Sequence, residues 1–300
     1  MLYLGSDAVP NAAEAVAAAR ADGMRAAFVT NNASRRSATV ARHLAELGIP
    51  AEPGEVVTSA QAATRWLAAR LPPGSTVLVL GTAELAEEVA AGGMRPVRTA
   101  DGALAVVQGL DPTTGWRELA EASVAIRAGA LWVAGNADST YPSRRGPLPG
   151  NGAMVQALVT ATGHRPIVVG KPEPELHAAA VERVGARRPL VVGDRLDTDV
   201  LGAVRAGADS LLVLTGVTDR EQLLATPAGT RPTYVSHDLR ALVQPHARPV
   251  LSGSTARCGP ASASYEGDEL RTSGPDDDAL RAACALAWSR QDAARAGCGA

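Results

Sequence analysis

The sequence lacks the features that mark several classes of protein. No basic run stands out in it, and its 29 Lys and Arg residues are balanced by 31 Asp and Glu residues. The net charge of −2 argues against a nucleic-acid-binding surface. No apolar stretch approaches the roughly 18 residues of a membrane-spanning helix. No basic segment followed by an apolar one opens the chain, so we expect no secretory leader and a cytoplasmic protein.

Cysteine and lysine are scarce. Cys258, Cys284 and Cys298 are the three cysteines, and their odd number without C-x-x-C spacing argues against a disulfide framework and against a zinc site. Lys171 is the one lysine among the 29 basic residues. It is either a chance survivor or the mark of a site that needs a compact ammonium and cannot use the planar guanidinium of arginine.

What the sequence does contain is a regular alternation of short apolar runs with alanine-rich amphipathic segments. This alternation predicts an α/β fold with a doubly wound parallel sheet covered by helices on both faces. The expected strands are 24–29, 76–80, 104–107, 131–134, 166–169, 189–192 and 210–214. The expected helices are 12–21, 37–47, 60–69, 83–90, 116–127, 153–161, 174–184 and 198–206.

The C-terminal part differs in composition. From about residue 245 the chain is rich in Ser, Gly and Pro, which predicts a linker or a weak hairpin. The last stretch begins with three aspartates and carries arginines toward its end, as a helix does. Leu280, Cys284 and Trp288 would share one face of this helix, and we expect that face to dock onto the body of the protein.

Polar residues follow three of the expected strands, where ligands bind in open α/β sheets. Thr30, Asn31 and Asn32 follow the first strand, and Lys171 stands between a glycine and a proline after another. Taken alone, the Asn-rich turn is more typical of a helix cap than of a phosphate site. A lysine in such a loop is more often simply solvated, although this one is the chain's only lysine.

The third strand end is acidic. Asp194 follows an apolar run and a glycine, and Asp197 and Asp199 come within the next turn. Acidic residues also suit the first turn of a helix. However, three carboxylates in six residues form a hard-oxygen group suited to Mg²⁺, which prefers one or two carboxylates together with waters and substrate phosphate. We therefore favour a magnesium site here.

In this order, the motifs VTNN, GKPEPE and GDRLDTD resemble the second, third and fourth motifs of the haloacid dehalogenase-like phosphatases. The subfamily that they resemble carries a large α/β cap and includes phosphoglycolate, 4-nitrophenyl phosphate and glycerol-3-phosphate phosphatases. The resemblance covers residues 2–245. It implies a discontinuous core at 1–58 and 166–245 with an inserted cap at 59–165, and leaves 246–300 as a C-terminal extension.

The resemblance also implies roles for the strand-end residues. Thr30 and Asn31 would hold the transferring phosphoryl group, and Lys171 would offset charge between it and the nucleophile. Asp194 would bind Mg²⁺ with support from Asp199. The expected activity is hydrolysis of small phosphate monoesters, such as glycerol 3-phosphate or phosphoglycolate, through an aspartyl-phosphate.

The family's first motif, D-x-D-G, is not in this sequence. It would supply the nucleophile and the general acid. The segment LYLG resembles the family's residues directly after that motif, so Met1 stands where the family has a valine or isoleucine after the motif's glycine. Two explanations stay open. Either the start of the reading frame lies upstream of Met1, which we favour, or the protein has lost its nucleophile and only binds a phosphorylated metabolite. On both, the 300-residue chain as printed is expected to be inactive.

The expected cap holds further candidates for substrate contact. The loop 133–152 is rich in Gly, Pro and polar residues, and we expect its side chains to reach a small phosphate ester unless the loop is only a surface turn. The expected substrate-binding residues are Asn32, Asn136, Asp138, Tyr141 and Arg144.

Other functions fit less well. VLVLGTAEL has the strand–glycine–helix order of a nucleotide-binding oxidoreductase, but G-x-G-x-x-G is missing. The expected partner is a small phosphorylated metabolite, with neither nucleic acid nor membrane involved and with a homodimer possible.

Overall fold

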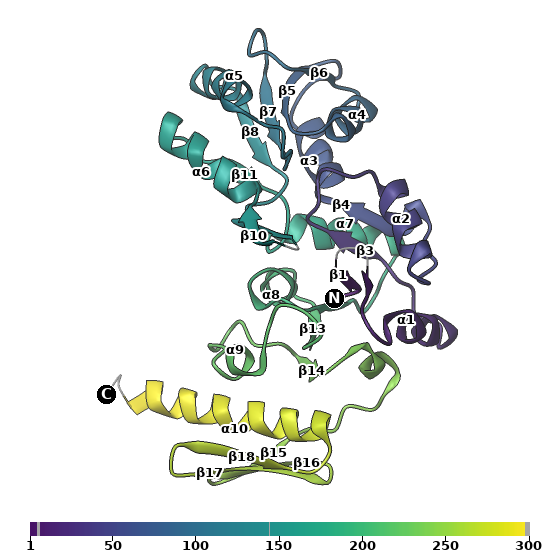
Figure 1. Cartoon of the computed structure of the whole chain (residues 1–300), viewed down its shortest axis with the longest axis vertical. Coiled ribbons are helices and arrows are strands. Elements are labelled where there is room, and N and C mark those ends of the chain that lie inside the picture. The colour runs from purple at the N-terminus through teal and green to yellow at the C-terminus, as the bar shows by residue number, and fades with distance from the viewer. Residues whose placement is uncertain (5–6, 144, 298–300) are drawn as a thin grey trace. The chain divides into compact units, whose positions relative to one another are not determined.

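The computed structural model describes residues 1–4, 7–143 and 145–297. The chain divides into two compact units, one formed by Met1–Arg25 with Arg187–Ala300 and the other by Ala26–Ala186 (Figure 1). The core and cap boundaries expected from the sequence cut the chain differently and stay a prediction.

The unit Ala26–Ala186 contains a five-stranded parallel sheet in the order β11-β8-β7-β5-β6. Its strands are β5 (Thr76–Leu80), β6 (Arg95–Val97), β7 (Ala105–Gln108), β8 (Leu131–Ala134) and β11 (Ile167–Val168). The helices of this unit are α2 (Ser37–Glu46), α3 (Ser59–Ala68), α4 (Ala83–Ala91), α5 (Trp116–Arg127), α6 (Asn151–Thr162) and α7 (Pro174–Val184), with a 3₁₀ turn at Pro53–Glu55. The continuous apolar strand β5 is buried along its whole length, as expected of a parallel strand with both faces covered.

Two further strand pairs belong to this unit. β3 (Phe28–Thr30) pairs in parallel with β4 (Val56–Thr58). β9 (Thr140–Ser143) and β10 (Gly146–Pro149) form an antiparallel hairpin. A capping box starts α3 directly after β4, because Thr58 and Gln61 each accept a hydrogen bond from the other's backbone N–H.

The other unit contains a three-stranded parallel sheet in the order β12-β13-β14. The strands are β12 (Leu190–Gly193), β13 (Asp209–Val213) and β14 (Tyr234–Ser236). The same unit holds the hairpin β1 (Tyr3–Leu4) with β2 (Asp7–Ala8), α1 (Ala12–Ala21), a π-helical turn at Leu196–Val200, α8 (Leu201–Arg205), α9 (Arg220–Leu224) and a 3₁₀ turn at Leu239–Val243. The expected helix 198–206 is therefore split between the π turn and α8.

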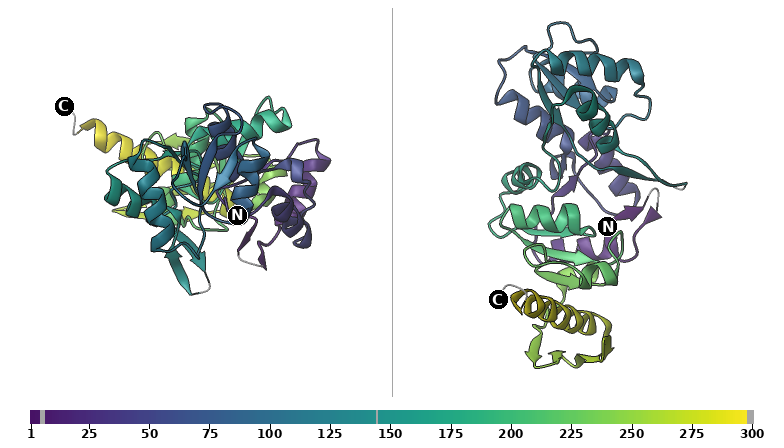
Figure 2. Two further views of the ribbon diagram at one scale, coloured as in Figure 1. Left: turned by 90° about the horizontal axis from the view of Figure 1, so that it is seen from above. Right: turned by 90° about the vertical axis from the view of Figure 1, so that its left-hand side faces the viewer.

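The C-terminal extension is more ordered than the sequence indicated. In place of a linker there is a four-stranded antiparallel sheet, formed by β15 (Val250–Ser252), β16 (Thr255–Cys258), β17 (Ala261–Glu266) and β18 (Glu269–Ser273). The terminal helix α10 (Asp276–Gly297) lies along this sheet (Figure 2). The strands were missed because the small residues Ala256, Ala261 and Ala263 take most of the buried positions on β16 and β17, where larger apolar side chains would have marked strands.

The docking face predicted for the terminal helix is confirmed. Leu280 and Cys284 are buried in one core cluster with Leu212 of β13 and Val235 of β14, and Trp288 packs against this cluster. Burial raises the pKa of the Cys284 thiol to about 12. No helix in the part of the chain that the structure describes is both long and apolar enough to cross a membrane.

Candidate functional site

Thr30 is the last residue of β3 and opens a tight turn. Its Oγ1 accepts the N–H of Asn32 at 3.1 Å, and the Asn32 Oδ1 accepts the N–H of Ser34 at 2.7 Å and its hydroxyl at 2.6 Å. The Asn32 side chain is thus part of the turn. Because the Thr30 oxygen acts as an acceptor here, its hydroxyl hydrogen can be donated to another group.

Asn31 connects this turn to Lys171, which lies 140 residues further along the chain. The Asn31 Oδ1 accepts the backbone N–H of Lys171 at 2.7 Å, and the Asn31 Nδ2 donates to the Lys171 carbonyl at 3.1 Å. Both ends of one side-chain amide therefore hold the backbone of the same residue. The strand ends that carry the second and third motifs are together in this unit.

Three more residues complete this arrangement. The Asn31 carbonyl accepts bonds from Ser59 Oγ and Asn136 Nδ2, each at 2.7 Å, and Asp138 Oδ2 accepts from Asn31 Nδ2 at 3.2 Å. We call the five residues the Asn31 network: Asn31, Ser59, Asn136, Asp138 and Lys171. The buried Asn136 also uses its Oδ1, which accepts the Asp138 N–H.

The structure says less about the other two residues predicted to bind substrate, Tyr141 and Arg144. Tyr141 lies on β9 with 45% of its surface exposed. Arg144 lies outside the residues that the structure describes. Substrate binding by Asn32, Asn136, Asp138 and Tyr141 stays a prediction.

In the other unit, Asp194 follows the end of β12. Its Oδ2 accepts the N–H of Val217 at 2.9 Å, and its Oδ1 lies 3.2 Å from the N-terminal ammonium of Met1. A side chain at Gly216 would collide with this carboxylate, so only glycine fits beside it. The carboxylate is mostly shielded, with 13% of the side chain exposed, and it already attracts a cation.

Asp199 is buried and supports the same loop, residues 193–199, which we call the Asp194 loop. Its Oδ2 accepts the backbone N–H groups of Asp194 and Arg195, each at 3.2 Å. Asp197 instead forms a two-point ion pair with Arg195, at 3.0 and 2.7 Å. Asp194 and Asp199 are thus shielded and accept bonds from backbone N–H groups, whereas Asp197 is exposed.

The Asp194 loop fits a magnesium ion. Among the described residues no three His, Cys, Asp or Glu side chains lie close enough together to hold a metal by themselves. Mg²⁺ does not require such a cage, since it takes one or two carboxylates and fills its other positions with water and substrate oxygens. The shielded Asp194 carboxylate offers hard oxygens of the kind that this ion binds.

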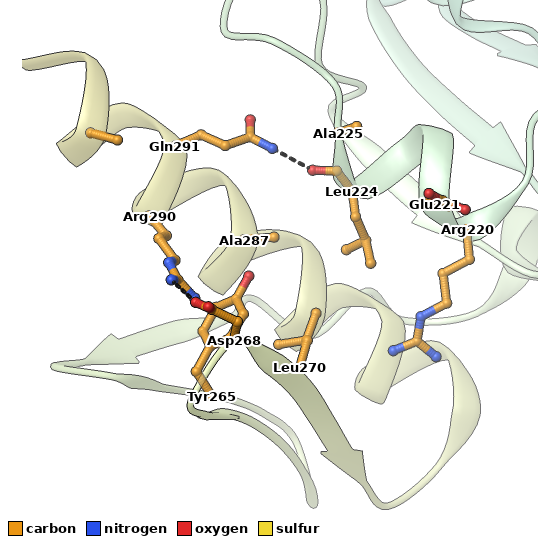
Figure 3. A pocket seen from close by; sticks show the side chains of 11 residues that line it. Arg220, Glu221, Leu224, Ala225, Tyr265, Asp268, Leu270, Ala287, Arg290 and Gln291 are labelled. Atoms are coloured by element: carbon orange, nitrogen blue, oxygen red, sulfur yellow. Dashed lines mark hydrogen bonds and ion pairs between the residues drawn. The ribbon is translucent and has the colours of Figure 1, made fainter. Parts of the chain in front are cut away.

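A cavity of about 660 Å³ lies elsewhere in the same unit, between α9, α10 and the β17–β18 hairpin (Figure 3). Its polar side chains bind one another: Arg290 pairs with Asp268 at 2.6 Å and lies over the Tyr265 ring, while Gln291 donates to the Leu224 carbonyl. None of the residues predicted for the site lines this cavity, and we assign no function to it.

Sequence reasoning missed several contributors. Ser59 follows the end of β4 directly, so the same strand-end rule would have found it had Val56–Thr58 been predicted as a strand. Gly216 and Val217 lie three and four residues after the end of β13. Glycine and backbone N–H groups carry no chemical signal of their own in a sequence, which is why this part of the Asp194 loop's surroundings was not anticipated.

Comparison with known proteins tests the resemblance that the three motifs indicated. A family model described as haloacid dehalogenase-like hydrolase matches residues 1–95, and a related HAD-hydrolase-like model matches residues 168–242. An acid sugar phosphatase from Staphylococcus saprophyticus is 34% identical over 245 residues, which cover 81% of this chain and 93% of that protein. The chain belongs to the haloacid dehalogenase-like hydrolases. The resemblance read from its three motifs is thereby confirmed.

Two further comparisons give higher sequence identity. A D-glycerol 3-phosphate phosphatase from Mycobacterium tuberculosis is 59% identical over 221 residues, or 73% of this chain. The match spans 63% of that relative's own length. The crystal structure of a glycerol phosphate phosphatase from the same organism, in complex with magnesium, shows 46% identity and a TM-score of 0.83. It covers 97% of this chain and 88% of the solved one, so the α/β fold with its sheet and helices is shared.

Proposed function

We propose that this hydrolase is a magnesium-dependent phosphatase that acts on small phosphate monoesters, with glycerol 3-phosphate or a similar metabolite as substrate. The observation that carries the proposal is the pair of bonds from the Asn31 amide to the Lys171 backbone, because they join the second and third motifs in one place. The names of the similar proteins, phosphatases of glycerol 3-phosphate and of sugar phosphates, support the substrate class. A cytoplasmic location is part of the proposal.

The chain's own residues would bind and orient the phosphate ester. The Thr30 hydroxyl and the N–H groups of the turn after β3 would donate to phosphoryl oxygens, and the Lys171 ammonium would offset the negative charge that gathers there. Asp194, supported by Asp199, would hold Mg²⁺, which when bound stabilises negative charge on phosphoryl oxygens. Such hydrolysis depends mainly on positioning and electrostatic stabilisation.

The carboxylate nucleophile implied by the resemblance is not among the printed residues. We propose that it belongs to a strand upstream of Met1, carrying D-x-D-G. This strand would fit beside β12, which has a neighbour on one side only among the strands that the structure describes. Open strand edges favour pairing with a further strand.

The experiment compares two proteins: the printed chain, and an extended chain in which a strand with D-x-D-G precedes it. The extended chain should hydrolyse 4-nitrophenyl phosphate and glycerol 3-phosphate only when Mg²⁺ is present, and Asp194→Asn should abolish this activity. The printed chain should be inactive. A folded extended chain without phosphatase activity would contradict the proposal and favour a protein that only binds phosphorylated metabolites.

A further inference from the structure

The strongest unexplained feature is the way in which Asn31 is used. The side chain of a residue expected to hold phosphate is instead bonded to protein at both ends, with Oδ1 on the Lys171 N–H and Nδ2 on the Lys171 carbonyl. A neutral amide that binds both backbone groups of one residue fixes the position of that residue's Cα. Gly170 allows this approach, because a Cβ there would lie 2.8 Å from Asn31 Oδ1.

Asp138 reinforces the direction of the Asn31 amide, which the Lys171 N–H and carbonyl also select. A carboxylate can only accept hydrogen bonds, so its Oδ2, 3.2 Å from Asn31 Nδ2, requires the NH₂ side of the amide to face it. The Oδ1 is thereby directed to the Lys171 N–H. Reversing the amide would place two acceptors against each other and two donors against each other.

Asp138 is itself held from two sides. Its N–H donates to Asn136 Oδ1 at 3.2 Å, and its carbonyl accepts the N–H of Gly152 at 2.8 Å. A Cβ at Gly150 or at Gly152 would collide with the backbone of this turn, so the turn is closely packed. The Asp138 carboxylate is therefore presented from a fixed backbone.

We infer that Asn31, oriented by Asp138, is a positioning residue: it holds the Lys171 backbone so that the ammonium reaches the phosphoryl group. This inference rests on the proposed function. A lysine side chain has four rotatable bonds, and its head group can be no better placed than its Cα. Misplacing a catalytic group by about 1 Å can lower the rate about 10²-fold. Asn31 and Asp138 then act through Lys171 and do not themselves touch the substrate.

The first test observes the contact without using activity. Because Lys171 is the sole lysine, labelling with ¹⁵N-lysine gives a single backbone amide signal in the printed chain. This amide should exchange with solvent slowly, and Asn31→Ala should speed its exchange at least tenfold, with a smaller increase in Asp138→Asn. Asp111→Asn is the matched control, since Asp111 accepts bonds only within its own turn, from Thr113. Equal exchange in Asn31→Ala and in the unchanged protein would overturn the inference.

The second test uses kinetics of the extended chain. Asn31→Ala should lower kcat on the order of 10²-fold for 4-nitrophenyl phosphate and for glycerol 3-phosphate alike, while KM changes little. The double variant Asn31→Ala/Asp138→Ala should be no slower than Asn31→Ala alone, because the two residues act as one unit. Additive losses, or a loss confined to the hydroxylated substrate, would show that Asp138 contacts substrate directly and would overturn the positioning role.

A swap separates positioning from general stability. Asn31→Asp removes the NH₂ donor and sets two carboxylates beside each other, so it should be at least as slow as Asn31→Ala. Adding Asp138→Asn to this variant removes the repulsion and should raise its kcat about tenfold. No recovery would count against the orienting role of Asp138. If the extended chain without substitutions is inactive, the proposed function is refuted. The exchange of the Lys171 amide in the printed chain still tests the contact with Asn31 in that case.

Discussion

The Asn31 network and the Asp194 loop each hold the backbone of a predicted site residue with a neighbouring side chain, but the bonds differ in their sequence range. In the network, bonds join residues that are up to 140 positions apart, and Lys171 is held by a side chain from another strand end. In the loop, Asp199 binds the N–H groups of residues four and five positions before it. The first arrangement depends on the tertiary fold, whereas the second is mostly local and is completed by Val217 and Gly216. Substitutions should therefore disturb them differently.

The largest effect should come from the network's charged group. Lys171→Ala in the extended chain should lower kcat about 10³-fold, because a preorganised charge at the phosphoryl group is removed. Folding should be unchanged, since the network holds Lys171 by its backbone, which alanine keeps. Steady-state kinetics together with thermal unfolding test this, and a chain that keeps most of its activity would contradict the role of the ammonium.

In the Asp194 loop the corresponding supporting residue is Asp199. Asp199→Asn should weaken magnesium affinity about 10- to 100-fold, as loss of a residue that orients a metal ligand commonly does. Titrating activity with Mg²⁺ measures the change, and kcat at saturating metal should recover. A loss that high magnesium fails to repair would mean that Asp199 shapes the loop's fold more than its metal affinity.

The sequence predicted the local loop better than the distant network. The spacing of Asp194, Asp197 and Asp199 predicted a group of carboxylates, and the family resemblance selected Asp194 and Asp199 as the magnesium site, which stays a prediction. The helices 12–21, 116–127 and 174–184 were predicted with the bounds that the structure shows. The motifs also identified Asn31 and Lys171, but not the bonds between them. Partners for a side-chain amide come from whichever strand ends the fold brings near, and Ser59, the first residue of α3, gave no signal in the sequence of its bond to Asn31. The alanine- and serine-rich strands β15–β18 were missed for lack of an apolar pattern.

Two glycines offer a matched comparison of the regions. Gly216→Ala would press against the Asp194 carboxylate, and Gly170→Ala would press against the Gly135 carbonyl and Asn31 Oδ1. Each should cost about 1–3 kcal/mol of unfolding free energy, as overpacking does. Gly216→Ala should also weaken magnesium binding, whereas Gly170→Ala should lower kcat at saturating magnesium. Gly54→Ala is the control, since a Cβ there meets nothing within 4 Å.

The smallest effect concerns Cys284 on α10. Burial raises the Cys284 pKa from 9.0 to about 12, so the folded protein keeps the thiol protonated where the unfolded chain loses its proton. The free energy of unfolding is therefore unaffected by this thiol's ionisation below pH 9 and falls as the pH rises toward 12. Urea unfolding at about pH 8 and about pH 10 should show a smaller loss of stability in Cys284→Ala than in the unchanged chain. Equal losses in both would exclude Cys284 as a source of alkaline sensitivity.

The central proposal is that phosphate binding near Lys171 depends on the Mg²⁺ that Asp194 would hold. The most direct measurement follows the single ¹⁵N-lysine amide signal of the extended chain while inorganic phosphate is added, with and without Mg²⁺. The account predicts a saturable shift that needs both ions and disappears in Asp194→Asn. A shift that is the same without Mg²⁺, or that persists in Asp194→Asn, would contradict it.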